Sequence, residues 1–442
     1  MKVKFIDLFA GMGGIRLGFE QAFQGMGFET ECVLTSEIKP YAVQALKDNF
    51  SQDNLVGDIC KVDAKDIPDF DILLAGFPCQ AFSTAGKGLG FLDTRGTLFF
   101  EVERILCEKK PYGFILENVE GLVLHDREST KDAIGRTLKT ILLSLVNLGY
   151  QVEWRLLECQ KFGVPQLRKR IFIVGTKDKH IDMDSFIETK SVVGNVLEHG
   201  KPVEDTHFTR CLLSHYKPQE LHGKAIKDKR GGKNNIHSWD IGLKGEISRE
   251  QQIIVEKLFR ERRKKHWAEE IGIKWMDGMP LTLEQISTFH KSDDLEYLLE
   301  DLVDKGYLVK EHPKDIVEVI MEDGSKRSVR QQDKTKAIGY NIVSGKLSFE
   351  FTKILDSSDV APTLVAADVS HIAVVDGEGI RKLTLREGLR MFGYPETYNL
   401  SMFDDNGTGL AKAFDLLGNT VVVPVVKAVA EKLCEVYIDS HK

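Results

Sequence analysis

The sequence predicts an α/β fold, with a parallel sheet covered by helices and an inserted domain of mixed α+β character. In roughly the first 180 residues, short apolar strands alternate with helical stretches. From about His180, Gly, Lys and His become frequent and the helical segments turn strongly charged. From Arg381 the earlier character returns and ends in a helix. We therefore expect a first domain split into 1–180 and 371–442, and a second domain at 181–370.

The individual elements follow from apolar runs bounded by turn residues and from apolar residues at helical spacing. The expected strands are Val3–Phe9, Glu31–Ser36, Asp71–Gly76, Gly113–Glu117, Gln151–Leu157 and Arg170–Gly175. The expected helices are Gly14–Phe23, Tyr41–Asn49, Leu98–Lys109, Thr130–Leu148 and Pro424–Val436, with Leu281–Phe289 and Asp294–Lys305 in the insert.

A hairpin with an Asp-Gly turn is expected at Val317–Lys326, directly after the two helices of the insert. Helix, helix and hairpin in this order resemble a winged helix. Many ordinary α+β units share the same order, so both interpretations stay open.

Composition indicates a soluble globular protein of 442 residues, 42% hydrophobic and 29% charged. We expect no membrane span, and no signal peptide, because the chain goes straight into a strand. Seven scattered cysteines without a C-x-x-C pair indicate reduced thiols in the cytoplasm and no metal site. The net charge of −7 means that nucleic-acid binding would need a local basic surface.

The most informative motif is Gly76–Ala81, which follows the apolar run Asp71–Ala75. Pro78 fixes the backbone just before Cys79, at the carboxyl end of a strand, where open α/β folds bind ligands. A lone cysteine is more often a small buried hydrophobe. Cys79 stands out because a glycine-rich turn precedes it and two polar motifs follow it.

The glycine-rich turn ends the first strand and opens a helix, with glycines at 11, 13 and 14. This spacing differs from the G-x-G-x-x-G dinucleotide fingerprint. Glu37 ends the second strand, where it could bind a pair of ribose hydroxyls, and Asp58 could accept a hydrogen bond from an adenine amino group. A plain strand–helix turn with solvated carboxylates explains these residues about equally well.

A nucleophilic Cys79 needs a partner acid, and Glu117 ends another strand, across the rim of the sheet. Gln166, Arg168 and Arg170 alternate, so on an extended segment they would share one face. Two guanidiniums on one face suit a phosphate, a carboxylate or a pyrimidine carbonyl. A core cysteine, a capping glutamate and a solvated basic strand are the simpler explanations of each feature alone, but their combination favours a functional site.

With these motifs the chain resembles the DNA (cytosine-5) methyltransferases of bacterial restriction–modification systems, over roughly 3–180 and 361–436. The resemblance implies a Rossmann-like, S-adenosylmethionine-dependent methyltransferase domain with an inserted target-recognition domain. The motifs that carry it are Asp7–Gly14, Gly76–Gln80, Glu117–Val119, Gln166-x-Arg168-x-Arg170, Arg386-Glu387 with Gly393–Pro395, and Gly418–Val421.

The resemblance also implies a mechanism. The target cytosine is flipped out of the duplex, and the Cys79 thiolate adds to C6 of the ring. Glu117 contacts N3 and the exocyclic amine and helps to protonate N3. Arg168 would hold the pyrimidine carbonyl and orient Cys79, with Gln166 and Arg170 in support. C5 then takes the methyl group of S-adenosylmethionine.

The cofactor residues are also implied by the resemblance. Phe9 would stack near the adenine, Glu37 would bind the ribose, and Asp58 and Ile59 would meet the base. The remaining cofactor-binding residues expected are Gly11, Met12, Gly13, Gly14, Ile38, Pro78, Tyr394, Asn419 and Thr420. The segment Ala81–Gly90 looks like the mobile loop that closes over DNA, although a plain solvent loop has the same composition.

The insert carries the local basic excess that DNA binding would need. Lys224–Lys274 contains 14 Lys and Arg against 8 Asp and Glu, a net charge of +6. Lys229–Asn235 and Arg260–Trp267 suit phosphate contacts, and the alternative is a solvated charged helix. We therefore expect double-stranded DNA as the partner. The resemblance further implies a monomer without a stable protein partner, and leaves a cognate restriction endonuclease in the same system as a possibility.

Two other functions stay open at this point. A methyltransferase of the same family acting on tRNA shares the motifs but usually has a smaller recognition region. A binding protein that keeps the fold without catalysis would not need intact Cys79, Glu117, Arg168 and Asn419. An N4- or N6-methylating enzyme would carry an Asp/Asn-Pro-Pro-aromatic motif where Pro78-Cys79 stands.

Overall fold

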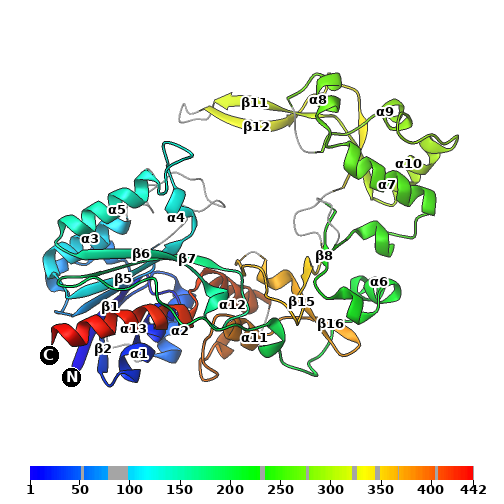
Figure 1. Cartoon of the computed structure of the whole chain (residues 1–442). Helices are drawn as coiled ribbons and strands as arrows, with labels where there is room; N and C mark the ends of the chain where they lie inside the picture. Colours follow the sequence, from blue (N-terminus) through cyan, green and yellow to red (C-terminus); the bar gives the residue numbers. More distant parts are fainter. Residues whose placement is uncertain are drawn as a thin grey trace. The chain divides into compact units, whose positions relative to one another are not determined.

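A computed structural model describes most of the chain, as two compact units. The described residues are 1–50, 54–77, 98–228, 234–274, 278–320, 326–343, 349–366, 368–403 and 407–441. The first unit comprises Met1–Glu198, Asp356–Ser370 and Leu383–Lys442, and the second comprises His199–Leu355 and His371–Lys382. Figure 1 traces both along the sequence.

The first unit is built on a seven-stranded sheet in the order β3-β2-β1-β4-β5-β7-β6. Its strands are β1 (Lys2–Leu8), β2 (Glu29–Ser36), β3 (Leu55–Val56), β4 (Ile72–Ala75), β5 (Gly113–Val119), β6 (Gln151–Glu158) and β7 (Lys169–Thr176). The six predicted strands are therefore confirmed to within two residues at each end. The prediction of a parallel sheet is wrong for β7, which runs antiparallel to both β5 and β6.

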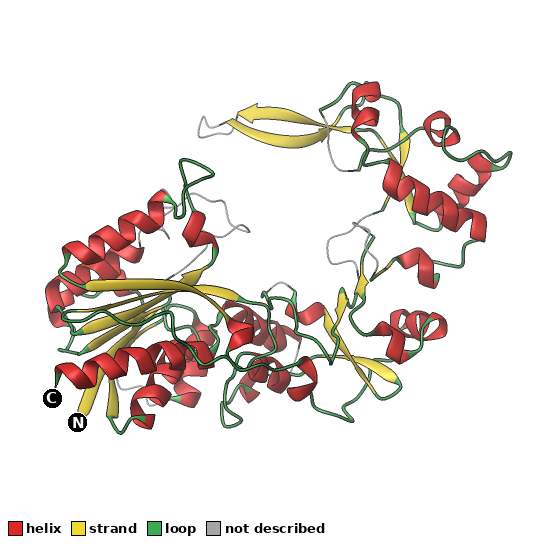
Figure 2. Ribbon diagram, viewed as in Figure 1, coloured by secondary structure: helices red, strands yellow, loops and turns green. Residues whose placement is uncertain are grey.

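Helices cover both faces of this sheet, as Figure 2 shows. Ile6 and Leu8 of β1 share one core with Phe99 of α3 (Leu98–Lys109) and Ile141 of α5 (Arg136–Asn147). On the other face Phe5 lies 4.8 Å from Phe19 of α1 (Gly14–Gly25), measured between ring centroids. Because the central strands are buried on both faces, they are continuous apolar runs in the sequence. The helices of the unit are α1 (Gly14–Gly25), α2 (Pro40–Asn49), α3 (Leu98–Lys109), α4 (Gly121–Leu124), α5 (Arg136–Asn147), α11 (Leu385–Met391), α12 (Gly407–Asn419) and α13 (Val423–Ser440).

The helix predicted from Thr130 begins only at Arg136. Gly135 is its N-cap, and a Cβ atom at this position would lie 1.8 Å from the carbonyl oxygen of His125. The close approach of the two backbone segments therefore requires glycine here. Residues 130–135 form a turn instead, in which the Asp132 carboxylate accepts a hydrogen bond from the Ser129 backbone N–H.

One stretch, Gly409–Ser440, is long and apolar enough to cross a membrane, judged by length and composition alone. In the structure 72% of its most apolar window is buried. Its α13 portion lies along α1, where the rings of Phe23 and Tyr437 are 6.0 Å apart. We interpret the stretch as a core segment of the first unit.

Backbone pairing explains where one unit ends and the other begins. Residues 181–198 stay with the first unit, because Thr189 donates to the carbonyl of Lys161 and Val193 is fully buried. Residues 356–370 return to it, since Ala361 pairs with Gln166. These bounds differ from the change in composition near residues 180 and 370, on which the predicted insert was drawn.

The second unit has two cores. The first surrounds a five-stranded sheet in the order β16-β15-β14-β8-β9 and the helix α6 (His207–His215). The strands are β8 (Ala225–Ile226), β9 (Asn235–Ile236), β14 (Lys353–Ile354), β15 (Ile372–Asp376) and β16 (Gly379–Lys382). The parallel pair of β14 and β15 explains why residues 371–382 belong to this unit.

The second core lies among the helices in the middle of the insert. Its elements are α7 (Arg249–Glu261), α8 (Lys265–Ile271), α9 (Leu283–Ser287), α10 (Leu295–Asp304), β10 (Leu308–Glu311) and β13 (Gly339–Ile342). Between β10 and β13 the chain forms a hairpin of β11 (Lys314–Ile320) and β12 (Lys326–Gln332). The two predicted helices and the hairpin are thus confirmed, while the Asp-Gly turn itself lies outside the described residues.

Candidate active site

The glycine-rich turn bends the chain sharply between β1 and α1. Phe9, Gly11 and Gly13 all adopt positive φ angles, of 57°, 57° and 76°. Phe9 holds this uncommon conformation without being glycine. A Cβ built on Gly11 would have no atom within 4 Å, so space stays open beside the turn. The sharp bend places this turn at the carboxyl end of β1, where open α/β folds bind ligands.

Gly14 brings the closing segment of the chain against this turn. A Cβ at Gly14 would lie 2.5 Å from the Tyr394 hydroxyl and 3.0 Å from the Thr420 hydroxyl, so only glycine fits. The two hydroxyls are hydrogen-bonded to each other at 2.6 Å. Burial raises the pKa of Tyr394 well above its usual value. Next to Thr420, Asn419 is exposed, and its amide donates to the carbonyl and the carboxylate of Asp415.

Glu37, at the end of β2, ties the same turn to its neighbour strand. Its carboxylate accepts hydrogen bonds from the backbone N–H groups of Gly11 at 2.7 Å and of Ile38 and Lys39 at 2.8 Å. A carboxylate can accept about four hydrogen bonds, so it retains capacity for a further donor. Glu37 therefore lies where the sequence placed it, at the carboxyl ends of the first two strands.

Asp58 and Ile59 follow β3 on the same side of the sheet. The Asp58 carboxylate accepts from the Cys60 backbone N–H at 3.1 Å, and Ile59 is buried. The Ser36 hydroxyl donates to the Gly57 carbonyl at 2.8 Å, which joins the end of β2 to this turn. The strand ends thus bring the predicted acids to one edge.

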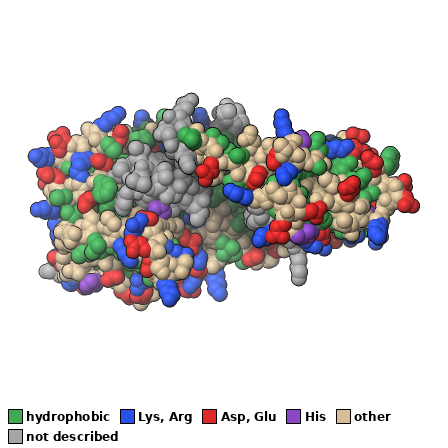
Figure 3. All heavy atoms as spheres, turned by 90° about the horizontal axis from the view of Figure 1, so that it is seen from above, with side chains coloured by type: hydrophobic (Ala, Val, Ile, Leu, Met, Phe, Trp, Pro, Cys, Tyr) green, Lys and Arg blue, Asp and Glu red, His purple; other side chains and the backbone are tan. Residues whose placement is uncertain are grey.

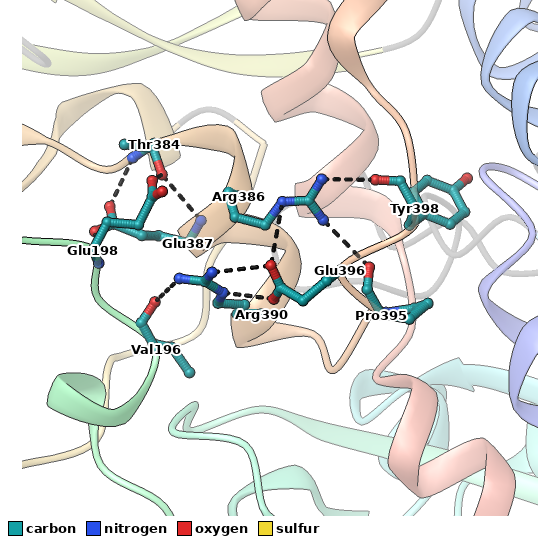
Figure 4. Close-up of polar contacts among 9 residues, drawn as sticks. All are labelled: Val196, Glu198, Thr384, Arg386, Glu387, Arg390, Pro395, Glu396 and Tyr398. Atoms are coloured by element: carbon teal, nitrogen blue, oxygen red, sulfur yellow. Dashed lines mark hydrogen bonds and ion pairs between the residues drawn. The ribbon is translucent and has the colours of Figure 1, made fainter. Parts of the chain in front are cut away.

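The closing segment owes its position to an arginine network, drawn in Figure 4. Arg386 donates to the carbonyls of Pro395 and Tyr398 at 3.3 and 3.0 Å. Arg390 pairs with Glu396 at 2.7 Å. The two guanidiniums therefore fix the loop that carries Tyr394.

Asp7 is a feature that the sequence analysis did not single out. It is fully buried on β1, and neither carboxylate oxygen has a hydrogen-bond partner among the described residues. Burial raises its pKa to about 7, with Arg16 acting in the opposite direction. The signal was present in the sequence, because Asp7 interrupts the apolar run Phe5–Leu8.

Glu117 and Arg170 form an ion pair at the carboxyl end of β5. Arg170 Nε lies 3.0 Å from Glu117 Oε1, and both side chains are largely shielded from solvent. Burial raises the pKa of Glu117, while Arg170 and Arg168 act in the opposite direction. A carboxyl that holds its proton more strongly than usual is suited to donate it during a reaction.

The backbone that leads to the predicted nucleophile lies beside this ion pair. A Cβ built on Gly76 would be 3.7 Å from Glu117 Oε2. The amide of Asn118, a further contact that the sequence analysis missed, donates to the Phe77 carbonyl at 3.2 Å. Pro78, Cys79 and the loop Ala81–Gly90 lie outside the described residues.

Arg168 and Gln166 occupy different surroundings from Arg170. Arg168 is buried and donates to the backbone carbonyls of Leu364 at 3.0 Å, Thr420 at 2.7 Å and Gly418 at 3.3 Å. Gln166 donates to the Met391 carbonyl and accepts from the Leu364 N–H. Both side chains therefore hold the closing segment in place.

The expectation of one shared arginine face is corrected by the backbone. The Arg168 N–H donates to the Gln166 carbonyl at 3.0 Å, so the chain turns tightly just before β7 begins at Lys169. Side chains alternate between faces only on extended backbone. Arg170 is consequently beside Glu117, whereas Arg168 is directed to backbone carbonyls.

The basic stretch of the second unit is also less open than the sequence suggested. Arg262 is 4% exposed and donates to the Asn341 side chain at 2.9 Å, and Lys264 pairs with Glu261 at 2.7 Å. The Arg263 guanidinium lies over the Phe259 ring, 4.9 Å from its centroid. Figure 3 shows basic and acidic side chains interspersed over one face of the molecule. Arg262 is therefore withdrawn from solvent, whereas the Lys264 side chain stays more than half exposed. Residues 229–233 lie outside the described residues.

Three features lie at one edge of the sheet: a glycine-rich turn, acids at the ends of the next strands, and a shielded carboxyl–guanidinium pair. Together they define an α/β enzyme of the class that uses a nucleotide cofactor. The chain belongs to the family of C-5 cytosine-specific DNA methylases, whose profile matches residues 3–435. Members of this family use S-adenosylmethionine as the methyl donor. The predicted family, fold class and enzyme class are thereby confirmed.

Relatives match along almost the whole chain. It is 56% identical over 432 residues to the type II methyltransferase M.NlaIV of Neisseria lactamica, covering 98% of this chain and 99% of that one. It is 40% identical over 458 residues to the type II methyltransferase M.BanI of Aneurinibacillus aneurinilyticus, covering 98% and 96%. Among solved structures, the methyltransferase EhMeth of Entamoeba histolytica shares the fold, with a TM-score of 0.51 at 14% identity and 99% coverage of both chains.

Proposed function

We propose that this C-5 cytosine-specific DNA methylase modifies one cytosine within a specific double-stranded sequence, as the cytoplasmic modification enzyme of a type II restriction–modification system. The main structural support for this proposal is the Glu117–Arg170 ion pair, which lies beside the backbone that leads to Cys79. High identity to type II methyltransferases over nearly full length supports the biological setting. We further propose that the enzyme acts as a monomer and forms no lasting complex with its endonuclease.

The residues at the strand ends fit S-adenosylmethionine. The turn at Gly11 has open space beside it, and the Glu37 carboxylate retains room for a ribose hydroxyl. In this proposal Phe9 stacks on the adenine, Asp58 and Ile59 bind its edge, and Asn419 with Thr420 close the pocket. When bound, S-adenosylmethionine supplies the electrophilic methyl group that C5 takes.

The chain's own residues prepare the cytosine for that transfer. The Cys79 thiolate forms a bond to C6 while the Glu117 carboxyl donates its proton to N3, and the electron pair of the C5–C6 double bond becomes available at C5. The raised pKa of Glu117 favours this donation. After methylation C5 gives its proton to solvent water, the electron pair of that C–H bond restores the C5–C6 double bond, and the Cys79 thiolate leaves C6. N3 then returns its proton to the Glu117 carboxylate.

Arg170 and Arg168 have different roles in this proposal. Arg170 keeps the Glu117 carboxyl in position through Nε and donates to the Lys169 carbonyl from Nη1, so Nη2 is its group for the cytosine carbonyl, a contact that the sequence analysis assigned to Arg168. Arg168 acts as a positioning residue, because its hydrogen bonds hold the segment that carries Thr420. The second unit selects the sequence to be methylated.

The test of the nucleophile is methyl transfer from tritium-labelled cofactor into unmethylated duplex DNA. Cys79→Ser should lose transfer while it keeps cofactor affinity, because a hydroxyl is a far weaker nucleophile at neutral pH. Cys107→Ser is the matched control, since Cys107 is an exposed free thiol on α3, away from the proposed site. Transfer by Cys79→Ser within tenfold of wild type would exclude Cys79 as the nucleophile.

A second test traps the covalent intermediate. Duplex DNA with 5-fluorocytosine at the target base should stay bonded to the protein after methylation, because fluorine cannot leave C5 as a cation. The adduct should survive denaturing electrophoresis and require the cofactor. Bisulfite sequencing of DNA from expressing cells then identifies the methylated cytosine and its context, and absence of any modified context would refute the proposed function.

A further inference from the structure

The helical core of the second unit has the order of a winged helix. After α7 and α8, Leu281 bridges Tyr340 of β13, and the chain then forms α9 and α10. Strand β13 pairs on its other side with β10, so Leu281, β13 and β10 lie side by side. The hairpin β11–β12 is inserted between β10 and β13, in the position of a wing. The winged-helix resemblance noted in the sequence thus extends to strand pairing.

In helix-turn-helix proteins the second helix of the motif usually reads the major groove. Here that helix is α10, which carries Glu296, Glu300, Asp301 and Asp304 and has no Lys or Arg. Glu300 and Asp301 pair with lysines, whereas Glu296 and Asp304 are exposed together with Tyr297. A helix of this charge is repelled by phosphates, so α10 is unsuited to enter a groove.

The hairpin β11–β12 offers the alternative. Its two strands form seven antiparallel residue pairs, and it extends away from the helices in Figure 1. At its base Ile316 packs against the helical core. A two-stranded ribbon of this kind fits the major groove of B-form DNA.

The two faces of the ribbon differ in what they present. Directly paired residues lie on the same face, so Asp315 with Gln331 near the base, Val317 with Val329, and Val319 with Arg327 form one face, here called the outward face. The face of Ile316 and Arg330 is the one that turns to the helical core at its base.

The outward face has the chemistry of a base reader. Val317 and Val319 are 41% and 38% exposed, and apolar side chains of this size can contact thymine methyl groups. The Arg327 side chain is exposed and has no ion-pair partner among the described residues. A guanidinium is the side chain that most often reads guanine, through two hydrogen bonds to O6 and N7.

We propose that the hairpin β11–β12 enters the major groove of the substrate duplex and determines part of the target sequence through its outward face, with Arg327 as the principal base contact. The inference rests on the proposed function, in which the second unit selects the DNA sequence. The acidic helix α10 stays away from the duplex. The partner that fits the outward face is duplex DNA. An exposed arginine between apolar side chains is complementary to the base edges in the major groove.

The experiment compares Arg327→Ala with Arg330→Ala in the full-length enzyme. Both arginines are exposed on the same strand, three residues apart, and they face opposite sides of the ribbon. Binding to a cognate and a scrambled duplex is measured over a range of salt concentrations. Arg327→Ala should weaken cognate binding by about tenfold or more and scrambled binding far less, because a lost base contact affects one sequence only. Arg330→Ala should change both duplexes alike.

Further variants separate the alternatives. Tyr297→Ala on α10 should leave the cognate preference unchanged. Equal cognate preference in wild type and Arg327→Ala, or a loss in Tyr297→Ala as large as in Arg327→Ala, would overturn the assignment. A dimer in sedimentation that Arg327→Ala abolishes would make the hairpin a contact between copies, and would overturn it as well. Each case leaves 5-methylcytosine production by the wild type intact, whereas failure of the proposed function removes that production itself.

Discussion

Replacing the buried carboxyl of Asp7 should change how the stability of the first unit depends on pH. In the folded chain burial raises the pKa of Asp7 from 3.8 to about 7. Below about pH 4 the carboxyl is protonated in both folded and unfolded chains and costs nothing. Between about pH 4 and 7 the unfolded chain releases the proton and the folded chain keeps it, so stability falls as pH rises. Above pH 7 the loss is complete.

The size of the loss follows from the shift. About three pKa units at ~1.4 kcal/mol each give about 4 kcal/mol between pH 4 and 7. About 3 kcal/mol of this loss falls between pH 5 and 8, which corresponds to roughly 5 °C in melting temperature for a unit this large. Asp7→Asn has no proton to release, so it should lack this component. A constant cost of burying the amide would shift the variant's plot of melting temperature against pH to lower temperature without changing the slope of that plot.

Melting temperatures of wild type and Asp7→Asn, recorded from pH 5 to 8, supply the test. The wild type should lose melting temperature relative to the variant as pH rises. Asp66→Asn, at an exposed carboxyl on the same unit, should follow the wild type. Parallel curves for wild type and Asp7→Asn would show that Asp7 is already ionised in the folded chain at pH 5, against the reasoning above.

Three further substitutions test the packing of the site and of the insert. Gly14→Ala should weaken S-adenosylmethionine binding in calorimetry and lower stability by about 1–3 kcal/mol, because its Cβ would overlap the Tyr394 hydroxyl. Combining it with Tyr394→Phe should recover part of the affinity and part of the stability. No recovery would mean that the strain lies elsewhere. Arg168→Lys should lose at least two charged hydrogen bonds to backbone carbonyls, lowering the urea midpoint by the equivalent of about 3 kcal/mol, and an unchanged midpoint would refute this role. Arg262→Ala should make the second unit more sensitive to proteolysis, because Arg262 is buried. Arg260→Ala, at an exposed position, should not. Equal digestion of the two variants would contradict the burial of Arg262.

The sequence allowed good prediction of elements whose signal is local. The buried strands are apolar runs, and Leu98–Lys109 was predicted with the bounds that α3 has. The direction of β7 could not be predicted, because strand pairing depends on which neighbour the chain meets and leaves no local pattern. The start of α5 was missed because the contact that demands Gly135 comes from the distant backbone of His125.

The site was predictable in its residues more than in their contacts. Glu37, Asp58 and Glu117 end strands of one sheet, so the topology alone brings them to one edge. Arg168 and Arg170 have different surroundings because the chain turns tightly before β7. No residue type between them predicts that turn. Asp7 was visible as a charge in an apolar run, but its lack of partners depends on the packing of α1 above it.

The interrupted path of the chain constrains how such enzymes can exchange specificities. The first unit uses three separate segments, so the chain passes between units four times, and a clean exchange of the whole second unit would have to preserve four junctions. The helical core of the second unit is different, because its elements from α7 to β13 form one continuous stretch, which shares its core with Trp239 and Ile247 just before it. A single recombination event could replace that stretch and leave every segment of the first unit untouched. Under the proposed role of the second unit, replacement of this stretch is the simplest route to a new target sequence.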